Sequence, residues 1–261
     1  MRRLALLPVL AVLAAGCGGG GGSSASNDDI ANAATKTAKA GSLEAEFAIS
    51  GQGIKGDGSG VFNTGKDSSG QLQMTVTSSG RQVPVDTIVT GQVFYMRSPA
   101  LSNTLSGGKQ WIKVDLNELA KQRGVNLGSL FDASPTPMNA LAYLAGSSKV
   151  EKVGAESVGG TDTTHYRVTV DVKQAAKKAS GAARRSIRSV LTQGGVSKLP
   201  LDVWVDGNNY IRKVIYNEQA PGQSPTKVTM QLHDFGKPIS IQAPPSQAVV
   251  DLLQLQAGGG Q

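Results

Sequence analysis

The chain has 261 residues, and its 39% hydrophobic and 17% charged residues are typical of a globular protein, which excludes an intrinsically disordered one. It contains one cysteine, which excludes a disulfide framework and a cysteine-rich metal site. The formal net charge of +7 is a moderate basic excess. Such an excess is common on solvated surfaces and does not by itself indicate a binding partner.

The N-terminus has the pattern of a secretory signal. Arg2 and Arg3 precede an apolar run from Leu4 to Ala15, and small residues then lead to Cys17. The run is too short to span a membrane, so we expect residues 1–16 to be a signal peptide. The small residues before Cys17 resemble the lipobox of bacterial lipoproteins, which implies a lipid on the cysteine sulfur. The alternative is an ordinary signal peptide with an incidental cysteine.

The residues after Cys17 favour a domain anchored to a membrane. Glycines and serines predict a flexible tether over residues 17–27, and we expect a single domain over residues 28–261. The lipid would hold this domain on the extracytoplasmic face of the cell membrane. Loss of Arg2 and Arg3 leaves 24 basic residues against 19 acidic ones, a net charge of +5. This excess suits anionic headgroups, and we expect no nucleic-acid partner for an exported protein.

A helix followed by several strands is predicted for the first half of the domain. Residues 28–40 have the pattern of a short helix, capped by Asn27 or Asp28, with small residues along one side. The pattern then changes to the twofold alternation of strands. We expect strands at residues 43–49, 61–62, 72–76, 83–87, 93–96 and 111–116, with a turn at residues 65–70.

Helices and strands alternate in blocks in the second half. Helices are predicted at residues 117–123, 135–144, 173–193 and 247–255, the second capped by Ser134 and the third containing Gly181, where bending is expected. Strands are predicted at residues 149–158, 164–172, 199–206, 210–218 and 226–235. The short connections between strands predict an α+β fold, in which helices gather on one face of an antiparallel sheet.

The sharpest local signal is a hairpin. Leu199–Asp206 and Tyr210–Val214 alternate on either side of a turn that contains glycine and asparagine, residues that tolerate positive φ. With this hairpin and residues 92–96, 111–114 and 159–171, the chain resembles the LppX/LprG-type bacterial lipoproteins and their relatives with a LolA/LolB-like fold. The resemblance implies a curved antiparallel β half-barrel whose concave face is covered by helices around an apolar cavity for acyl chains. It brings no catalytic residue.

Alternating apolar positions supply a candidate wall for that cavity, because the free energy recovered by a bound chain scales with the apolar area removed from water. The strand positions are Phe47, Ile49, Leu72, Met74, Val76, Val168, Val170, Leu201, Val203, Val205, Val228, Met230 and Leu232. The helix positions are Met138, Leu141, Leu144, Ile187 and Val190. The alternative is a plain core, since any sheet covered by helices carries such a stripe.

A basic stripe runs along the predicted helix at residues 173–193. Lys173, Lys177, Arg184 and Arg188 fall on one side of it, beside an apolar arc. Such a helix can lie at a headgroup boundary or steer an anionic lipid toward a cavity. The alternative is a solvated helix face above the core.

The residues carry no catalytic or metal-binding motif. His165 and His233 lie in strand patterns, where we expect outward or edge positions. The sequence contains no Gly-x-Ser-x-Gly nucleophile elbow and no motif of metal ligands. We therefore predict a monomer without enzymatic activity, cofactor or metal. It would bind acyl chains of lipids or glycolipids and carry or present them across the cell envelope, with a membrane transporter as a further partner. The alternative is a tethered adaptor or sensor that binds a protein partner without lipid.

Overall fold

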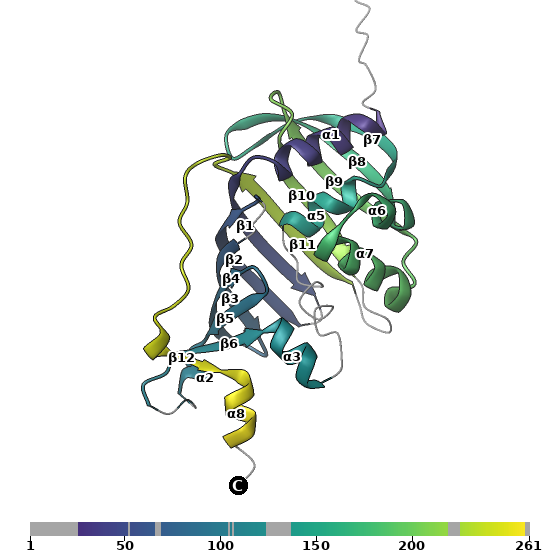
Figure 1. The fold of residues 1–261 in the computed structure, drawn as a ribbon. Coiled ribbons are helices and arrows are strands. Elements are labelled where there is room, and N and C mark those ends of the chain that lie inside the picture. Colours follow the sequence, from purple (N-terminus) through teal and green to yellow (C-terminus); the bar gives the residue numbers. More distant parts are fainter. Residues whose placement is uncertain are drawn as a thin grey trace, which may run out of the picture.

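The computed structural model describes residues 26–51, 53–65, 69–103, 105, 107–123, 137–218 and 225–258 (Figure 1). The predicted signal peptide, Cys17 and most of the tether lie outside these residues, as does the predicted helix start at Ser134 and Pro135.

The described residues form one sheet of 12 strands, in the order β12-β6-β5-β4-β3-β2-β1-β11-β10-β9-β8-β7. The strands are β1 (Ser42–Gly51), β2 (Ile54–Asn63), β3 (Ser69–Ser78), β4 (Arg81–Thr90), β5 (Val93–Arg97), β6 (Trp111–Asp115), β7 (Ser147–Val158), β8 (Thr161–Asp171), β9 (Lys198–Asp206), β10 (Ile211–Glu218), β11 (Thr226–His233) and β12 (Val249–Asp251).

The sheet is long, open and curved, which confirms the predicted α+β half-barrel (Figure 1). Strands β2–β6 and β7–β11 each form a run of antiparallel neighbours, and β1 joins the two runs by pairing with both β2 and β11. The antiparallel prediction holds for every pair except the last, because β12 is parallel to β6.

Helices gather over one half of the inner face of the sheet. They are α1 (Asn27–Ala38), α2 (Pro99–Ser102), α3 (Leu116–Arg123), α5 (Pro137–Leu144), α6 (Val172–Lys178), α7 (Gly181–Gly194) and α8 (Leu252–Gly258), with a 3₁₀ turn at Ser246–Ala248. Helices α1, α5, α6 and α7 lie together against the half that contains β7–β11, whereas α3 and α8 lie near β6 (Figure 1). None of the helices in the described part of the chain has the length and apolar character that a membrane crossing needs.

Helix α1 begins at a capping box that the sequence analysis placed wrongly. Ser26, not Asn27 or Asp28, is the cap: its Oγ accepts a hydrogen bond of 3.2 Å from the Asp29 amide, and the Asp29 carboxylate accepts one of 2.7 Å from the Ser26 amide. This reciprocal pair satisfies two amides that the first turn leaves free. Of the small residues predicted along one side of the helix, Ala33, Ala34 and Thr37 are buried and Ala38 is partly buried.

The helix predicted at residues 173–193 is two helices. Helix α6 ends at Lys178, Ala179 and Ser180 are extended, and α7 begins at Gly181, whose φ is +55°. Glycine adopts this left-handed conformation without the steric cost of a side chain, so the residue expected to bend the helix instead stands at the start of a second one.

The helix predicted at residues 247–255 is also wrong over its first part. Residues Val249–Asp251 form strand β12, and α8 starts only at Leu252. The two valines are β-branched and fit a strand better than a helix, and β6 offers them an unpaired edge. An ion pair of 3.3 Å between Lys113 and Asp251 adds to this pairing.

Candidate functional site

The register of the strands decides which side chains share the inner face, because paired residues of antiparallel strands point to the same side. Phe47 of β1 pairs with the buried Met230 of β11, so the alternate residues of β1 that include Phe47 and Ile49 point inward. The same register continues through β2 to β3 and places Leu72, Met74 and Val76 on this face. The predicted wall positions of β1, β3 and β11 therefore do lie on one surface.

Strand β2 contributes a row of glycines to the inner face: Gly56, Gly58 and Gly60. A methyl group on Gly58 would come within 2.1 Å of the Gln73 carbonyl oxygen, and one on Gly60 within 2.6 Å of the Gln71 carbonyl oxygen. At Gly58 and Gly60 the strands approach too closely for a side chain unless the backbone shifts. Residues 61–62 alone are predicted as strand here, although the alternate glycines of residues 56–60 are also compatible with one.

The residues predicted to line a cavity divide into two groups. The larger group is fully buried in one core cluster together with Ile30 of α1, and comprises Phe47, Leu141, Leu144, Val168, Val170, Ile187, Leu201, Val203, Val205, Val228, Met230 and Leu232. These side chains pack sheet against helix, as the plain-core alternative expects. The side chain of Val190 lies outside the described part of the chain.

The second group is half-buried. It comprises Ile49, Leu72, Met74 and Val76 on the sheet and Met138 on α5, and of these Leu72 and Met138 pack against the core cluster. The register extends the surface of β1 and β3 across β4, β5 and β6, through residues that the sequence analysis did not select: Val83, Val85, Phe94, Met96, Ile112 and Val114. These too are half-buried. We call the inward apolar residues from Ile49 to Val114 on β1 and β3–β6 the apolar strip.

The outer face of β1, β2 and β3 is mostly polar. It carries a hollow of about 460 Å³, lined by side chains that include Glu44, Glu46, Gln71, Gln73 and His233. A hollow with carboxylates and amides on its walls does not suit an acyl chain, since a buried polar group needs a hydrogen-bond partner. The outer face is therefore not the place for an apolar ligand.

Three possible metal ligands lie close together at the rim of this hollow, and no local sequence motif predicts that they do. The ligand atoms of Glu44, His233 and Asp234 all lie within 4.8 Å of one another. Asp234 is already paired, because the Lys237 ammonium lies 2.8 Å from Oδ1 and His233 Nδ1 lies 3.3 Å from Oδ2. The hydrogen bond from Lys237 holds the pKa of the Asp234 carboxyl below its usual value. The negative charge of Asp234 is thus already balanced by Lys237.

His165 is on the outer face, as predicted, but it is buried there. Its Nδ1 lies 3.0 Å from a Glu156 carboxylate oxygen and its Nε2 lies 2.8 Å from Asp202. The ring stacks on Trp204, with the two centroids 4.1 Å apart. Trp204 Nε1 donates to Glu156 at 2.7 Å, and this bond is the main reason that the pKa of Glu156 is lowered. These contacts tie β7, β8 and β9 together.

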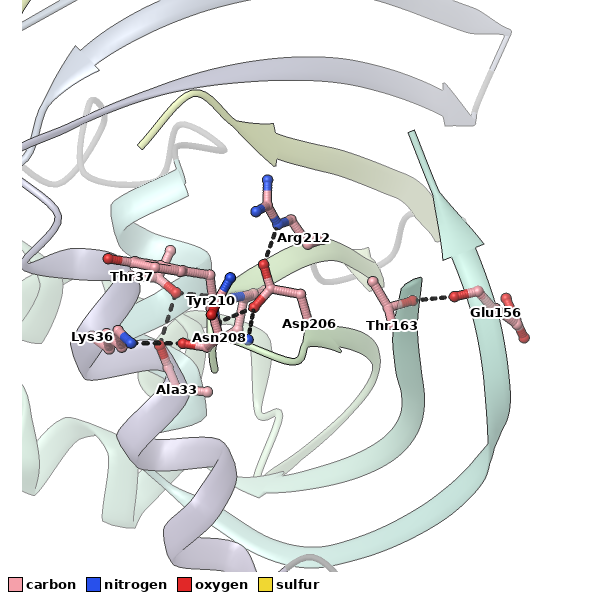
Figure 2. Close-up of polar contacts among 10 residues, drawn as sticks. Ala33, Lys36, Thr37, Glu156, Thr163, Asp206, Asn208, Tyr210 and Arg212 are labelled. Carbon is pink, nitrogen blue, oxygen red and sulfur yellow. Dashed lines mark hydrogen bonds and ion pairs between the residues drawn. The ribbon is translucent and has the colours of Figure 1, made fainter. Parts of the chain in front are cut away.

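The hairpin that carried the resemblance is held by one buried carboxylate (Figure 2). Asp206 Oδ1 accepts hydrogen bonds of 2.9 Å from the amides of Asn208 and Tyr210, and Oδ2 accepts one of 2.6 Å from Arg212.

Helix α1 is fastened to this hairpin. The Ile211 amide donates to Thr37 Oγ1 at 2.9 Å, and the Lys36 ammonium donates to the Asn208 carbonyl at 2.6 Å (Figure 2). The motif is thus a structural device that fixes α1 to the β9–β10 hairpin.

The predicted basic positions are all exposed, on two helices instead of one. Lys173 and Lys177 belong to α6, and Arg184 and Arg188 to α7. Arg184 has a structural task, since its Nε donates at 2.6 Å to the carbonyl of Ala179 just beyond α6.

Relatives of the chain occur among actinobacterial proteins. The chain is 30% identical over 161 residues to an uncharacterized 31.2 kDa protein encoded in the rplA–rplJ intergenic region of Streptomyces griseus. The match covers 59% of this chain and 52% of that protein, so the chain spans about half the length of this relative. It is 23% identical over 236 residues to a candidate lipoprotein of Streptomyces coelicolor, covering 86% of this chain and 74% of the relative. No family model matches the chain.

Among solved structures, the chain is similar to LprF from Mycobacterium bovis. The superposition has a TM-score of 0.54 at 13% identity and covers 85% of this chain and 99% of LprF. At this identity the likeness concerns the fold, and it agrees with the topology described above: one open antiparallel sheet with helices against its inner face. The chain therefore has the LppX/LprG-type lipoprotein fold that its hairpin indicated.

Proposed function

We propose that the protein is a lipoprotein, anchored to the membrane through Cys17, that binds acyl chains of lipids or glycolipids and carries or presents them in the cell envelope without enzymatic activity. The lipobox, the fold and the lipoprotein relative support this proposal. The observation that carries it is the apolar strip, a half-buried apolar surface that continues beyond the packed core.

The free energy of removing an acyl chain from a bilayer requires an apolar binding site that shields the chain from water. Extraction of one chain of about 16 carbons from a bilayer costs on the order of 13 kcal/mol, at about 0.8 kcal/mol per CH₂. A binding protein recovers this only by removing the chain from water over its whole length. The packed core cannot do so, because side chains such as Val203 and Met230 are already 0% exposed. The residues of the apolar strip are only half-buried, so apolar surface remains there for a bound chain. The inward glycines of β2 add no side chains that would occupy this surface.

The test is a comparison of two neighbouring residues on β3. Val76 points inward in the apolar strip and Thr75 points outward, and both are half-buried. A charge on the inner side would have to be buried against a bound chain, so Val76→Arg should weaken acyl binding at least about tenfold and Thr75→Arg should leave it unchanged. Binding is measured with a fluorescent fatty acid, and the lipid carried by the unaltered protein by mass spectrometry of organic extracts.

Two results would contradict the proposal. One is a folded, lipid-free protein that takes up no fatty acid, in which case a defined protein partner would favour the adaptor alternative. The other is equal acyl binding by Val76→Arg and Thr75→Arg, each checked for native circular dichroism. Substitutions at Val203 or Met230 would not serve, because a charge there would unfold the core.

A further inference from the structure

Helices α6 and α7 carry a one-sided charge. Residues 172–194 contain six basic residues and no acidic one. The exposed members that carry the argument are Lys173, Lys177, Lys178 and Arg188, and we call them the basic helix face.

Within the part of the chain that the structure describes, these charges have no carboxylate partner, in contrast to other lysines of the protein. Lys113, Lys149 and Lys237 each lie within 3.3 Å of a carboxylate. Among the residues that the structure describes, no member of the basic helix face forms an ion pair. A surface built only for solubility usually mixes both signs of charge, so a block of unpaired positive charge favours an anionic partner.

The two helices present this charge as one unit. Arg184, near the start of α7, donates from Nε to the Ala179 carbonyl at 2.6 Å and from Nη2 to the Lys177 carbonyl at 3.4 Å. These bonds satisfy carbonyls that the end of α6 leaves free and hold α7 against it. Arg184 is therefore a positioning residue, and we leave it out of the proposed contact.

Helix α6, which carries three members of the basic helix face, lies near the point where the described chain begins. The Asn27 side chain donates to the Ser148 carbonyl at 3.1 Å, which fixes the start of α1 to the start of β7. Two residues earlier, Gly146 accepts a bond of 3.0 Å from the Asp171 amide and packs so closely on α6 that a methyl group would lie 2.5 Å from the Ala175 nitrogen. The corner at residues 146–148 thus contacts both the start of α1 and the start of α6 (Figure 1).

The length of chain before α1 limits how far this corner can lie from an anchor. Nine residues lead from Cys17 to Ser26, and the glycine- and serine-rich tether predicted from the sequence would span about 15–18 Å by the scaling of 5–6 Å × √n. Charges separated by more than a Debye length, about 8 Å at physiological salt, are largely screened, so attraction would act when the tether brings the face closer to the bilayer than this mean span. A lipid on Cys17 would make such close approaches frequent.

We propose that the basic helix face binds the anionic headgroups of the membrane surface. Its place beside the anchor rests on the proposed lipidation of Cys17, but its attraction to anionic lipid does not. Each basic side chain near an anionic surface strengthens binding about fivefold, so four of them bind appreciably even without a lipid anchor.

The test uses the chain from residue 17 onward with Cys17→Ser, which keeps every described residue and removes the anchor. Its binding to phosphatidylcholine vesicles is measured by co-sedimentation, with and without phosphatidylglycerol, at low and high salt. The variant changes Lys173, Lys177, Lys178 and Arg188 to Gln. The control changes four exposed basic residues elsewhere to Gln, so that net charge falls equally: Lys55, Arg81, Lys121 and Lys227.

We expect binding that needs phosphatidylglycerol and is weakened by salt, lost at least about tenfold in the variant and less than about twofold in the control. Equal losses in both would show that net charge alone is responsible and would overturn the proposal. Absence of binding to anionic vesicles, or binding to soluble polyglutamate instead, would also overturn it. Acyl capture by the same variants, which should be unchanged, separates this proposal from the lipid-binding function.

Discussion

Gly58 lies where strands β2 and β3 approach too closely for any side chain. We expect Gly58→Ala to destabilise the protein by about 1–3 kcal/mol, because the new methyl group, 2.1 Å from the Gln73 carbonyl oxygen, forces the backbone to shift. The free energy of unfolding in denaturant measures the effect. Gly154→Ala is the matched control, since nothing lies within 4 Å of its Cβ position. Similar values for the two variants would mean that the close approach of β2 and β3 does not need glycine.

The Glu156 carboxylate makes part of the stability depend on pH. Its pKa is lowered in the folded protein, first by the hydrogen bond from Trp204 and then by His165, from an ordinary value of 4.5. A carboxyl with a lowered folded pKa stabilises the fold above its unfolded pKa and loses that contribution as pH falls through the folded pKa.

We therefore expect Glu156→Gln to be less stable than the unaltered protein near neutral pH, and the difference to shrink as pH falls below the ordinary carboxyl value of 4.5. Thermal unfolding across this range, followed by circular dichroism, gives the difference at each pH. Glu118→Gln, on the exposed surface of α3, is the control and should run parallel to the unaltered protein. A difference for Glu156→Gln that stays constant with pH would remove the carboxylate from this role.

At the scale of elements, strand β12 closes an edge. It pairs in parallel with β6, whose Trp111, Ile112 and Val114 are apolar. We expect a chain that ends before Ser246 to associate with itself, because an uncovered apolar edge strand pairs readily with another chain. Light scattering after size exclusion measures the mass. A chain that ends after Asp251 keeps β12 and should stay a monomer; if both shortened chains are monomers, β12 does not protect the edge.

The sequence could predict elements whose pattern is local and strong. Alternation located the strands of the second half, and glycine and asparagine located the turn between β9 and β10, where Asn209 has a φ of +61°. It failed where a tertiary partner decides. The break between α6 and α7 depends on Arg184 reaching back to Ala179, and β12 depends on the free edge of β6.

For the whole molecule, the fold could be predicted but the division of its inner face could not. Periodicity assigns Met230 and Met74 the same apolar, inward character. Only the placement of the helices makes Met230 part of a packed core while Met74 remains half-buried. The pairing of β1 with β11 brings those two regions onto one surface, and no local pattern announces a contact between strands so far apart in the chain.

The fastening of α1 also determines how the molecule would respond to tension. A pull on residue 17 enters the domain at Ser26, the first residue of the capping box. The bond between Asn27 and Ser148 would bear the load first, and the bonds of Lys36 and Thr37 to the β9–β10 hairpin would bear it last. Tension on the N-terminus would therefore detach α1 from the sheet, starting at its N-terminal end. This would expose Ile30 and the core residues that it covers before the strands of the sheet separate.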